Sequence, residues 1–147
     1  MADAVCGEIM TKEVAVSFPG DTVMRAAELM ARHHVGAIPV VDGEQTRALR
    51  GILTDRDIVV RLIARGGDPC NTKVDEVMTR DLVTCRPEQS VHDAIDVMAD
   101  RQVRRMPVVE GGRLVGMIAQ ADIASRELDR RKTAQMLEEI SQPEPKR

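Results

Sequence analysis

Apolar residues recur along this chain with two alternating periods, and the longer period predicts helices. In residues 23–30 the apolar side chains are spaced at i, i+3, i+4 and i+7, which places them on one face of a helix. Residues 91–98 repeat this spacing, and Ser90 before them is a candidate N-cap. Further helices are expected over residues 55–65 and from residue 121 onward.

Between these helices, short runs rich in Val, Ile and Leu predict strands. The expected strands cover residues 14–17, 38–41, 49–53, 106–109 and 114–118. The first half then runs strand, helix, strand, strand, helix, and the second half is interpreted as the same unit. The strand residues expected in the core are Ile38, Val40, Ile52, Met106, Val108, Met117 and Ile118.

The two halves are copies of one unit. Met10-Thr11 recurs as Met78-Thr79 and Pro39-Val40-Val41 recurs as Pro107-Val108-Val109, each 68 positions further on. Three extra residues in the first copy then reduce the offset to 65, so that Gly51 matches Gly116. We therefore divide the chain into a first repeat (6–65), a linker (66–73), a second repeat (74–128) and a C-terminal helical extension with a disordered tail (129–147).

Length indicates that the repeats share one core, because 147 residues is an ordinary single-domain size and each copy alone is small. The predicted class is α+β, with two β-α-β-β-α repeats packed sheet to sheet about a pseudo-twofold axis.

Charge and aromatic content argue against nucleic acid or a membrane surface as a partner. The net charge is −3, and Phe18 is the single aromatic residue among Phe, Trp and Tyr. No run in the sequence has signal-peptide character or enough apolar residues to cross a bilayer, so a cytoplasmic location is expected.

The three cysteines, Cys6, Cys70 and Cys85, lie far apart without CxxC spacing, which favours reduced structural thiols. The alternative is a zinc site that joins a cysteine to His33 or His34.

The expected C-terminal helix carries a short apolar stripe of Met136, Leu137 and Ile140. The stripe permits two interpretations: light packing of the extension on its own module, or a contact with a partner.

The sequence resembles the CBS domain, in the tandem form called a Bateman module. The resemblance rests on the Met-Thr pair, the Ala and Met helix face, Pro39-Val40-Val41-Asp42, and Gly51 to Ile58, and it covers about residues 6–128 in both copies. The chain is similar to small bacterial proteins made of one CBS pair, and no attached enzyme or transporter is expected. The resemblance implies a homodimer, and the expected contacts are two helix stripes, Ala26-Ala27-Met30 and Ala94-Ile95-Met98.

The resemblance also implies that an adenine nucleotide or related adenosyl ligand binds between the copies as a regulatory ligand, with no resident cofactor. Asp57 would accept from the ribose hydroxyls, Thr54 would bind near the phosphate, and Arg104 and Arg105 would hold the phosphate. The full expected set is Leu53, Thr54, Asp55, Arg56, Asp57, Val83, Arg104 and Arg105. Taken without the resemblance, a Thr-x-x-Asp step is also an ordinary helix cap, and arginines are usually solvated.

A second, weaker site is expected at the equivalent positions, because Ala119 replaces the threonine and Gly36-Ala37 replaces the arginine pair. Its candidate residues are Ala15, Gly36, Ala37, Gln120 and Asp122.

The sequence contains no Gly-rich phosphate loop, nucleophile elbow or HExxH motif, so catalysis is not expected. Three functions stay open: a ligand sensor, an adaptor that no longer binds nucleotide, and a metal-responsive module. The identity of a regulated protein partner is open as well.

Overall fold

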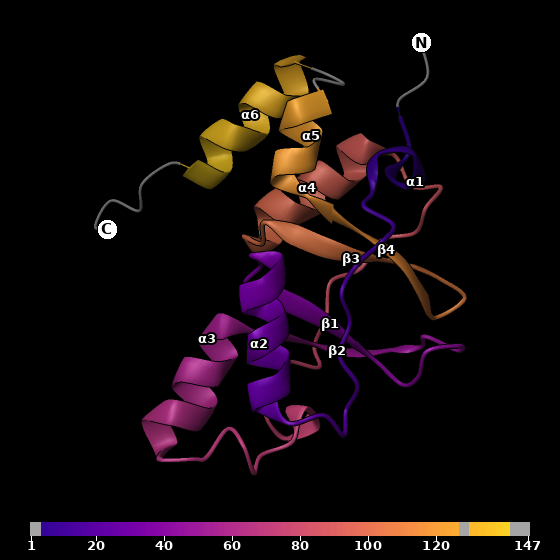
Figure 1. Ribbon diagram of the computed structural model, residues 1–147. Helices are drawn as coiled ribbons and strands as arrows, with labels where there is room; N and C mark the ends of the chain where they lie inside the picture. The colour runs from indigo at the N-terminus through magenta and orange to yellow at the C-terminus, as the bar shows by residue number, and fades with distance from the viewer. Residues whose placement is uncertain (1–3, 127–129, 142–147) are drawn as a thin grey trace. The chain divides into compact units, whose positions relative to one another are not determined.

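The computed structural model describes residues 4–126 and 130–141 and shows a mixed helix and strand fold (Figure 1). Its strands form two small antiparallel sheets, which confirms the predicted α+β class. One sheet pairs β1 (Ala37–Val41) with β2 (Leu49–Thr54), and the other pairs β3 (Arg105–Glu110) with β4 (Arg113–Ala119). No described helix is both long and apolar enough to span a bilayer.

Three helices begin within one residue of their predicted starts: α2 (Val23–His33), α4 (Val91–Arg101) and α5 (Gln120–Arg126). The segment predicted as a helix over residues 55–65 begins with α3 (Asp55–Asp57), and α6 (Arg130–Ser141) is the expected C-terminal helix. Helix α1 (Cys6–Ile9) was not predicted. Helical structure continues beyond α3 as a π-helical turn (Ile58–Leu62) and a 3₁₀ turn (Ile63–Arg65), and a further 3₁₀ turn spans Val74–Glu76. Ser90 caps α4 as predicted, because its side chain accepts from the backbone N–H of His92 at 3.0 Å.

The strand predicted at residues 14–17 does not form. Only Ser17 pairs, in an isolated parallel bridge to Val40, and Cys85 makes the equivalent bridge to Val108 in the second repeat. Apolar runs indicate an extended backbone, but a strand also needs a neighbouring backbone along several residues. Here the neighbouring strand pairs with the extended segment at a single position in each repeat, Ser17 in the first and Cys85 in the second.

The described chain groups into two compact units that do not follow the repeat boundaries in the sequence. Unit 1 contains residues 4–12 and 83–110, together with the described residues from 115 to 141. Unit 2 contains residues 13–82 and 111–114. Each unit therefore takes the Met-Thr segment of one repeat and most of the other repeat.

The exchanged segments pair with strands. In unit 1, Thr11 exchanges two backbone hydrogen bonds with Met117 of β4, at 2.8 and 3.0 Å. In unit 2, Thr79 does the same with Ile52 of β2, at 2.8 and 2.9 Å. Each sheet thus gains one bridge from a segment distant in the sequence.

The core of unit 2 lies between α2, which contacts β1, and the β1–β2 sheet. Leu53 is fully buried directly opposite Ile38, whereas Ile52, predicted to be in the core, is only half-buried. Successive residues of a strand point to opposite faces, so Leu53 shares the core face with Ile38 and Ile52 takes the other face. The other six predicted core strand residues are buried.

The core of unit 1 contains the apolar face of α4 and a residue of the C-terminal helix. Met136 of α6 is almost completely buried in it, while Ile140 packs at its edge. Helix α6 contacts α4 and α5, and Figure 1 shows the three helices beside one another. The stripe on α6 therefore packs on its own unit through Met136 and Ile140, and Leu137 stays partly exposed. The tail after residue 141, and residues 127–129, lie outside the described residues.

Two glycines at equivalent repeat positions allow the exchanged segments to approach the strands. A β-carbon on Gly116 would lie 2.8 Å from the carbonyl oxygen of Thr11, and one on Gly51 would lie 2.8 Å from that of Thr79. Neither contact could be relieved without moving backbone.

We expect Gly116→Ala to lower the free energy of unfolding by about 1–3 kcal/mol, because the methyl group must displace the paired Thr11 backbone. Gly20→Ala is the matched control, since nothing lies within 4 Å of its added β-carbon. That variant should be neutral or more stable by up to about 1 kcal/mol. Urea unfolding of both variants measures the difference, and equal stabilities would contradict the close approach.

Candidate ligand-binding site

Thr54 and Asp57 form a reciprocal cap at the start of α3. The Thr54 hydroxyl accepts from the backbone N–H of Asp57 at 3.0 Å, and the Asp57 carboxylate accepts from the backbone N–H of Thr54 at 3.0 Å. This arrangement satisfies two backbone donors at the helix start. The Thr-x-x-Asp step therefore has a local structural role, whatever it binds.

Asp57 is also the centre of a polar cluster inside unit 2. Its side chain is 10% exposed and accepts from the Thr79 hydroxyl at 3.1 Å. The Nε atom of Arg61 lies 3.8 Å from it, and the same guanidinium donates to the carbonyls of Val77 and Met78. The cluster ties the helix start to the Met-Thr segment of the second repeat. A ribose would have to share the carboxylate with these donors.

The other residues predicted beside Asp57 differ in accessibility. Leu53 is fully buried in the hydrophobic core of unit 2, so its side chain serves packing. Asp55 and Arg56 are exposed. A β-carbon added to Gly36 would lie 2.9 Å from the Asp55 carboxylate, and the backbone N–H of Asp55 donates to the Gly36 carbonyl at 2.9 Å. In unit 2, then, the start of α3 adjoins the residues before β1.

Unit 1 has the equivalent arrangement, and there it encloses a pocket of about 350 Å³. The backbone N–H of Gln120 donates to the Arg104 carbonyl at 2.8 Å, which brings the start of α5 next to the start of β3. The pocket is lined by Arg104, Arg105, Ala119, Gln120, Ala121, Ala124 and Leu137.

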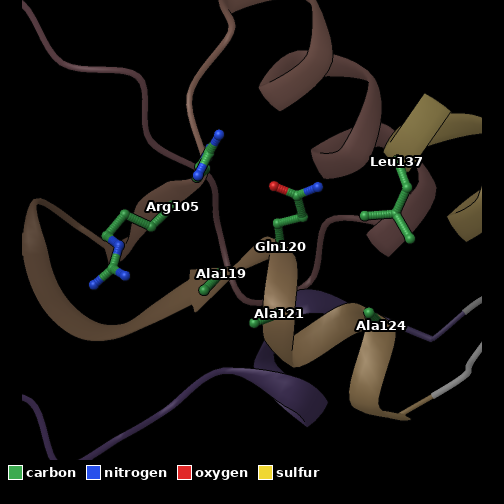
Figure 2. A pocket seen from close by; sticks show the side chains of 7 residues that line it. Arg105, Ala119, Gln120, Ala121, Ala124 and Leu137 are labelled. Atoms are coloured by element: carbon green, nitrogen blue, oxygen red, sulfur yellow. The ribbon is translucent and has the colours of Figure 1, made fainter. Parts of the chain in front are cut away.

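Figure 2 shows how these side chains lie. The Gln120 amide points into the space that Leu137 of α6 borders, while the Arg105 guanidinium points away from Gln120. The lining residues are two arginines, one glutamine and four apolar residues, with no acidic residue among them. Such a lining attracts anions and offers apolar contact to the rest of a ligand.

The structure thus brings the arginine pair together with Ala119 and Gln120, which the sequence analysis placed in the weaker site. Asp122 follows two residues later; it is half-buried, and its carboxylate accepts from the backbone N–H of Ala119 at 3.1 Å. Val83 packs at the edge of the unit 1 core, whereas Ala15 and Ala37 are half-buried residues of unit 2.

Sequence reasoning missed Ala121, Ala124 and Leu137 as lining residues. The signal that could have grouped the pocket is the repeat itself. Gly36 and Arg104 occupy one repeat position, and Asp55 and Gln120 occupy another. In both repeats the backbone N–H at the second position donates to the carbonyl at the first. Leu137 belongs to α6, outside the repeat, and had no such signal.

The histidines and cysteines do not gather into a ligand set. Among residues 4–126 and 130–141, no group of three or more His, Cys, Asp or Glu side chains is placed to hold a metal ion. His33 and His34 are exposed at the end of α2, and Cys70 is exposed in the loop between the 3₁₀ turns Ile63–Arg65 and Val74–Glu76. Cys6 and Cys85 are buried in unit 1.

Comparison with known proteins identifies the class. The CBS domain matches residues 6–64 and again residues 74–129, so the chain belongs to the CBS-domain family as a tandem pair. Pairs of this kind are regulatory modules.

Two relatives are similar over nearly their full lengths. The CBS domain-containing protein YhcV of Bacillus subtilis is 42% identical over 91% of this chain and 93% of its own length. Hypoxic response protein 1 of Mycobacterium tuberculosis is 36% identical over 92% of this chain and 93% of its own length.

Three solved structures share the fold. Hypoxic Response Protein I with two coordinated zinc ions has a TM-score of 0.77 and 35% identity, covering 86% of this chain and 100% of that one. A hexameric CBS-CP12 protein from bloom-forming cyanobacteria has a TM-score of 0.71 and 31% identity, over 86% and 73% of the two chains. CBSX2 in complex with AMP has a TM-score of 0.74 and 25% identity, over 85% and 96%.

We expect Asp57→Ala to lower the free energy of unfolding by about 1.5–3 kcal/mol, because it leaves the Thr79 hydroxyl and the Thr54 N–H without their acceptor. Asp55→Ala, an exposed position two residues earlier, should cost at most about 1 kcal/mol. Denaturant unfolding of both variants measures this. A loss at Asp57 no larger than at Asp55 would contradict a structural role for the cluster.

Proposed function

We propose that this chain is a non-enzymatic regulatory CBS module that binds a phosphorylated adenosyl ligand, with Arg104 and Arg105 on the phosphate side. The observation that carries the proposal is the pocket in unit 1, where two arginine residues contribute to the lining beside an apolar wall. The nucleotide acts here as a regulatory ligand and not as a resident cofactor.

The chemistry of the lining residues supports this ligand class. Guanidinium groups donate to phosphate oxygens through paired N–H groups, and these charge-assisted bonds are stronger than neutral ones. Ala119, Ala121 and Ala124 leave room beside the helix, and Leu137 offers an apolar surface to a flat base. The Gln120 amide can both donate to and accept from base or sugar groups. A volume of about 350 Å³ is within the range of small-molecule pockets.

The comparisons also support an adenosyl ligand. A fold relative at 25% identity was crystallised with AMP, which matches the anion and apolar character of the pocket. Regulation would follow from linkage: a ligand shifts the module only by the difference in its affinity for two arrangements, and a protein partner must prefer one of them.

Arg104→Ala and Arg105→Ala should each weaken AMP, ADP or ATP binding about ten- to a hundredfold, the equivalent of about 1.5–3 kcal/mol. Arg101→Ala, an exposed arginine at the end of α4 outside the pocket lining, is the matched control and should bind as wild type does. Isothermal titration measures all four proteins. Absence of binding by wild type, or equal affinity of all variants, would refute the proposal.

The same titration assigns the ribose acceptor. The sequence-based hypothesis predicts that Asp57→Ala weakens binding and that Asp122→Ala has little effect. A loss at Asp122 alone would instead assign the ribose to α5, the helix that begins at the pocket. Zinc and S-adenosylmethionine belong in the same screen, because a zinc response without nucleotide binding would favour the metal-responsive alternative.

We further propose that the chain forms a homodimer, through a surface other than the one expected from sequence. The helix faces expected to form the dimer contact pack in the cores of the units, where Ala26, Ala94 and Met98 are fully buried. Among the described residues, three of the four exposed large apolar residues follow α3: Val59, Val60 and Ile63 are 58%, 44% and 51% exposed, and the fourth, Leu137, lines the pocket. A second copy of this chain would cover the three after α3, and a hexameric relative supports self-association.

Val60→Glu should convert the dimer to monomer, because a carboxylate buried in an apolar contact has no partner. Ala31→Glu, at an exposed position of α2, is the control and should keep the wild-type mass. Light scattering at micromolar concentrations measures the masses. A wild-type monomer, or a dimer in both variants, would contradict this surface.

A further inference from the structure

One wall of the unit 1 pocket comes from outside the repeats. Among the described residues that line the pocket, six lie between Arg104 and Ala124, within the second CBS match, which ends at residue 129. The seventh is Leu137 of α6. Figure 2 shows Leu137 at the border of the space into which the Gln120 amide points. The pocket therefore has this wall only while α6 is docked on unit 1.

Helix α6 is held to unit 1 by few side chains. Of its residues 135–140, Met136 is 1% exposed in the unit 1 core, Ile140 packs at the edge of that core, and the other four are exposed. Helix α4 of the same unit has four buried residues. A helix held by so few buried side chains opens locally at a lower free energy than one held by several.

The length of α6 makes the helix dependent on docking. Isolated helices shorter than about 15 residues are marginally stable in water, and α6 spans 12 residues. The buried Met136 supplies the apolar contact that such a helix needs. Docking and helix formation are therefore one process, and unit 1 has two arrangements, with α6 docked or released.

Neighbouring side chains of α6 connect this process to the pocket. Successive helix residues are about 100° apart around the axis, so one helix turns Met136 into the core and Leu137 toward the adjacent pocket. Ile140 follows Met136 by four residues and lies on the same side of the helix. Release of Met136 and Ile140 from the core would therefore withdraw Leu137 from the pocket.

We propose that α6 is a ligand-responsive wall of the unit 1 pocket: Leu137 contacts the bound nucleotide, Met136 and Ile140 position it, and nucleotide binding stabilises docked α6. Because the ligand is taken to be a nucleotide in that pocket, this role of α6 rests on the proposed function. It adds the element whose arrangement the ligand changes. Linkage makes the effect reciprocal, so that release of α6 lowers the affinity for nucleotide.

Hydrogen exchange of the full wild-type chain tests the coupling. Saturating AMP should slow exchange of the α6 amides about five- to fiftyfold, within the usual range of coupling between two sites. Residues 66–73, a largely exposed loop of unit 2 that does not line the pocket, are the internal reference and should exchange at an unchanged rate.

Two variants of the full chain separate contact from positioning, with isothermal titration of AMP as the measurement. Leu137→Ala removes the wall contact and should weaken AMP binding at least about fivefold, with loss of the AMP-dependent slowing in α6. Met136→Asn releases α6 without changing a lining residue. It should weaken AMP binding by the same factor by which AMP slows α6 exchange in wild type, because the coupling is reciprocal.

Gln135→Asn is the matched control, since it places the same neutral residue at an exposed position of α6 that does not line the pocket. It should bind AMP as wild type does.

Absence of AMP binding by wild type would refute the proposed function and the role of α6 with it. AMP binding with unchanged α6 exchange, or with wild-type affinity in either Leu137→Ala or Met136→Asn, would overturn the role of α6 and leave the proposed function standing. The wild-type exchange measurement decides the coupling even if Met136→Asn fails to fold.

Discussion

The backbone pairing of each Met-Thr segment with a strand is the interaction on which the rest of this structure depends. A repeat of about 60 residues is too small to bury its own apolar faces, so each unit is completed by a segment from the other repeat. Thr11 pairs with a strand of one sheet and Thr79 with a strand of the other. A glycine at each contact leaves room for the incoming backbone. For this reason the boundaries of the compact units differ from the boundaries of the repeats in the sequence.

This pairing also positions polar side chains near the start of α3. Thr79 brings its hydroxyl to Asp57, so the carboxylate that resembles a family ligand contact is at the same time a structural link within unit 2. In unit 1 the segment with Thr11 brings the buried Cys6 beside the residues before α4, where the backbone N–H of Cys6 donates to the Gln89 carbonyl at 2.8 Å. One architectural device thus supports a buried polar cluster in one unit and a buried N-terminal segment in the other.

Duplication followed by divergence explains why the two units differ in what they offer a ligand. The positions before the first strand of each sheet are Gly36-Ala37 in one repeat and Arg104-Arg105 in the other, on the same backbone arrangement. The second repeat therefore presents guanidinium groups where the first presents none. The C-terminal helix then adds Leu137 to the wall, anchored by the buried Met136 beside it.

The sequence by itself determined the repeat, the helices and hairpins, the Ser90 cap and the family, because each depends on local spacing or on matching residues. Tertiary structure decided the rest. Residues 14–17 form no strand because the neighbouring strand pairs with them only at Ser17. Leu53, and not Ile52, lies on the core face because the register of β1 and β2 places Leu53 opposite Ile38. The residues that line a pocket with Arg104 and Arg105, and the pairing of Thr11 with Met117, depend on contacts between segments distant in the sequence, which local patterns do not encode.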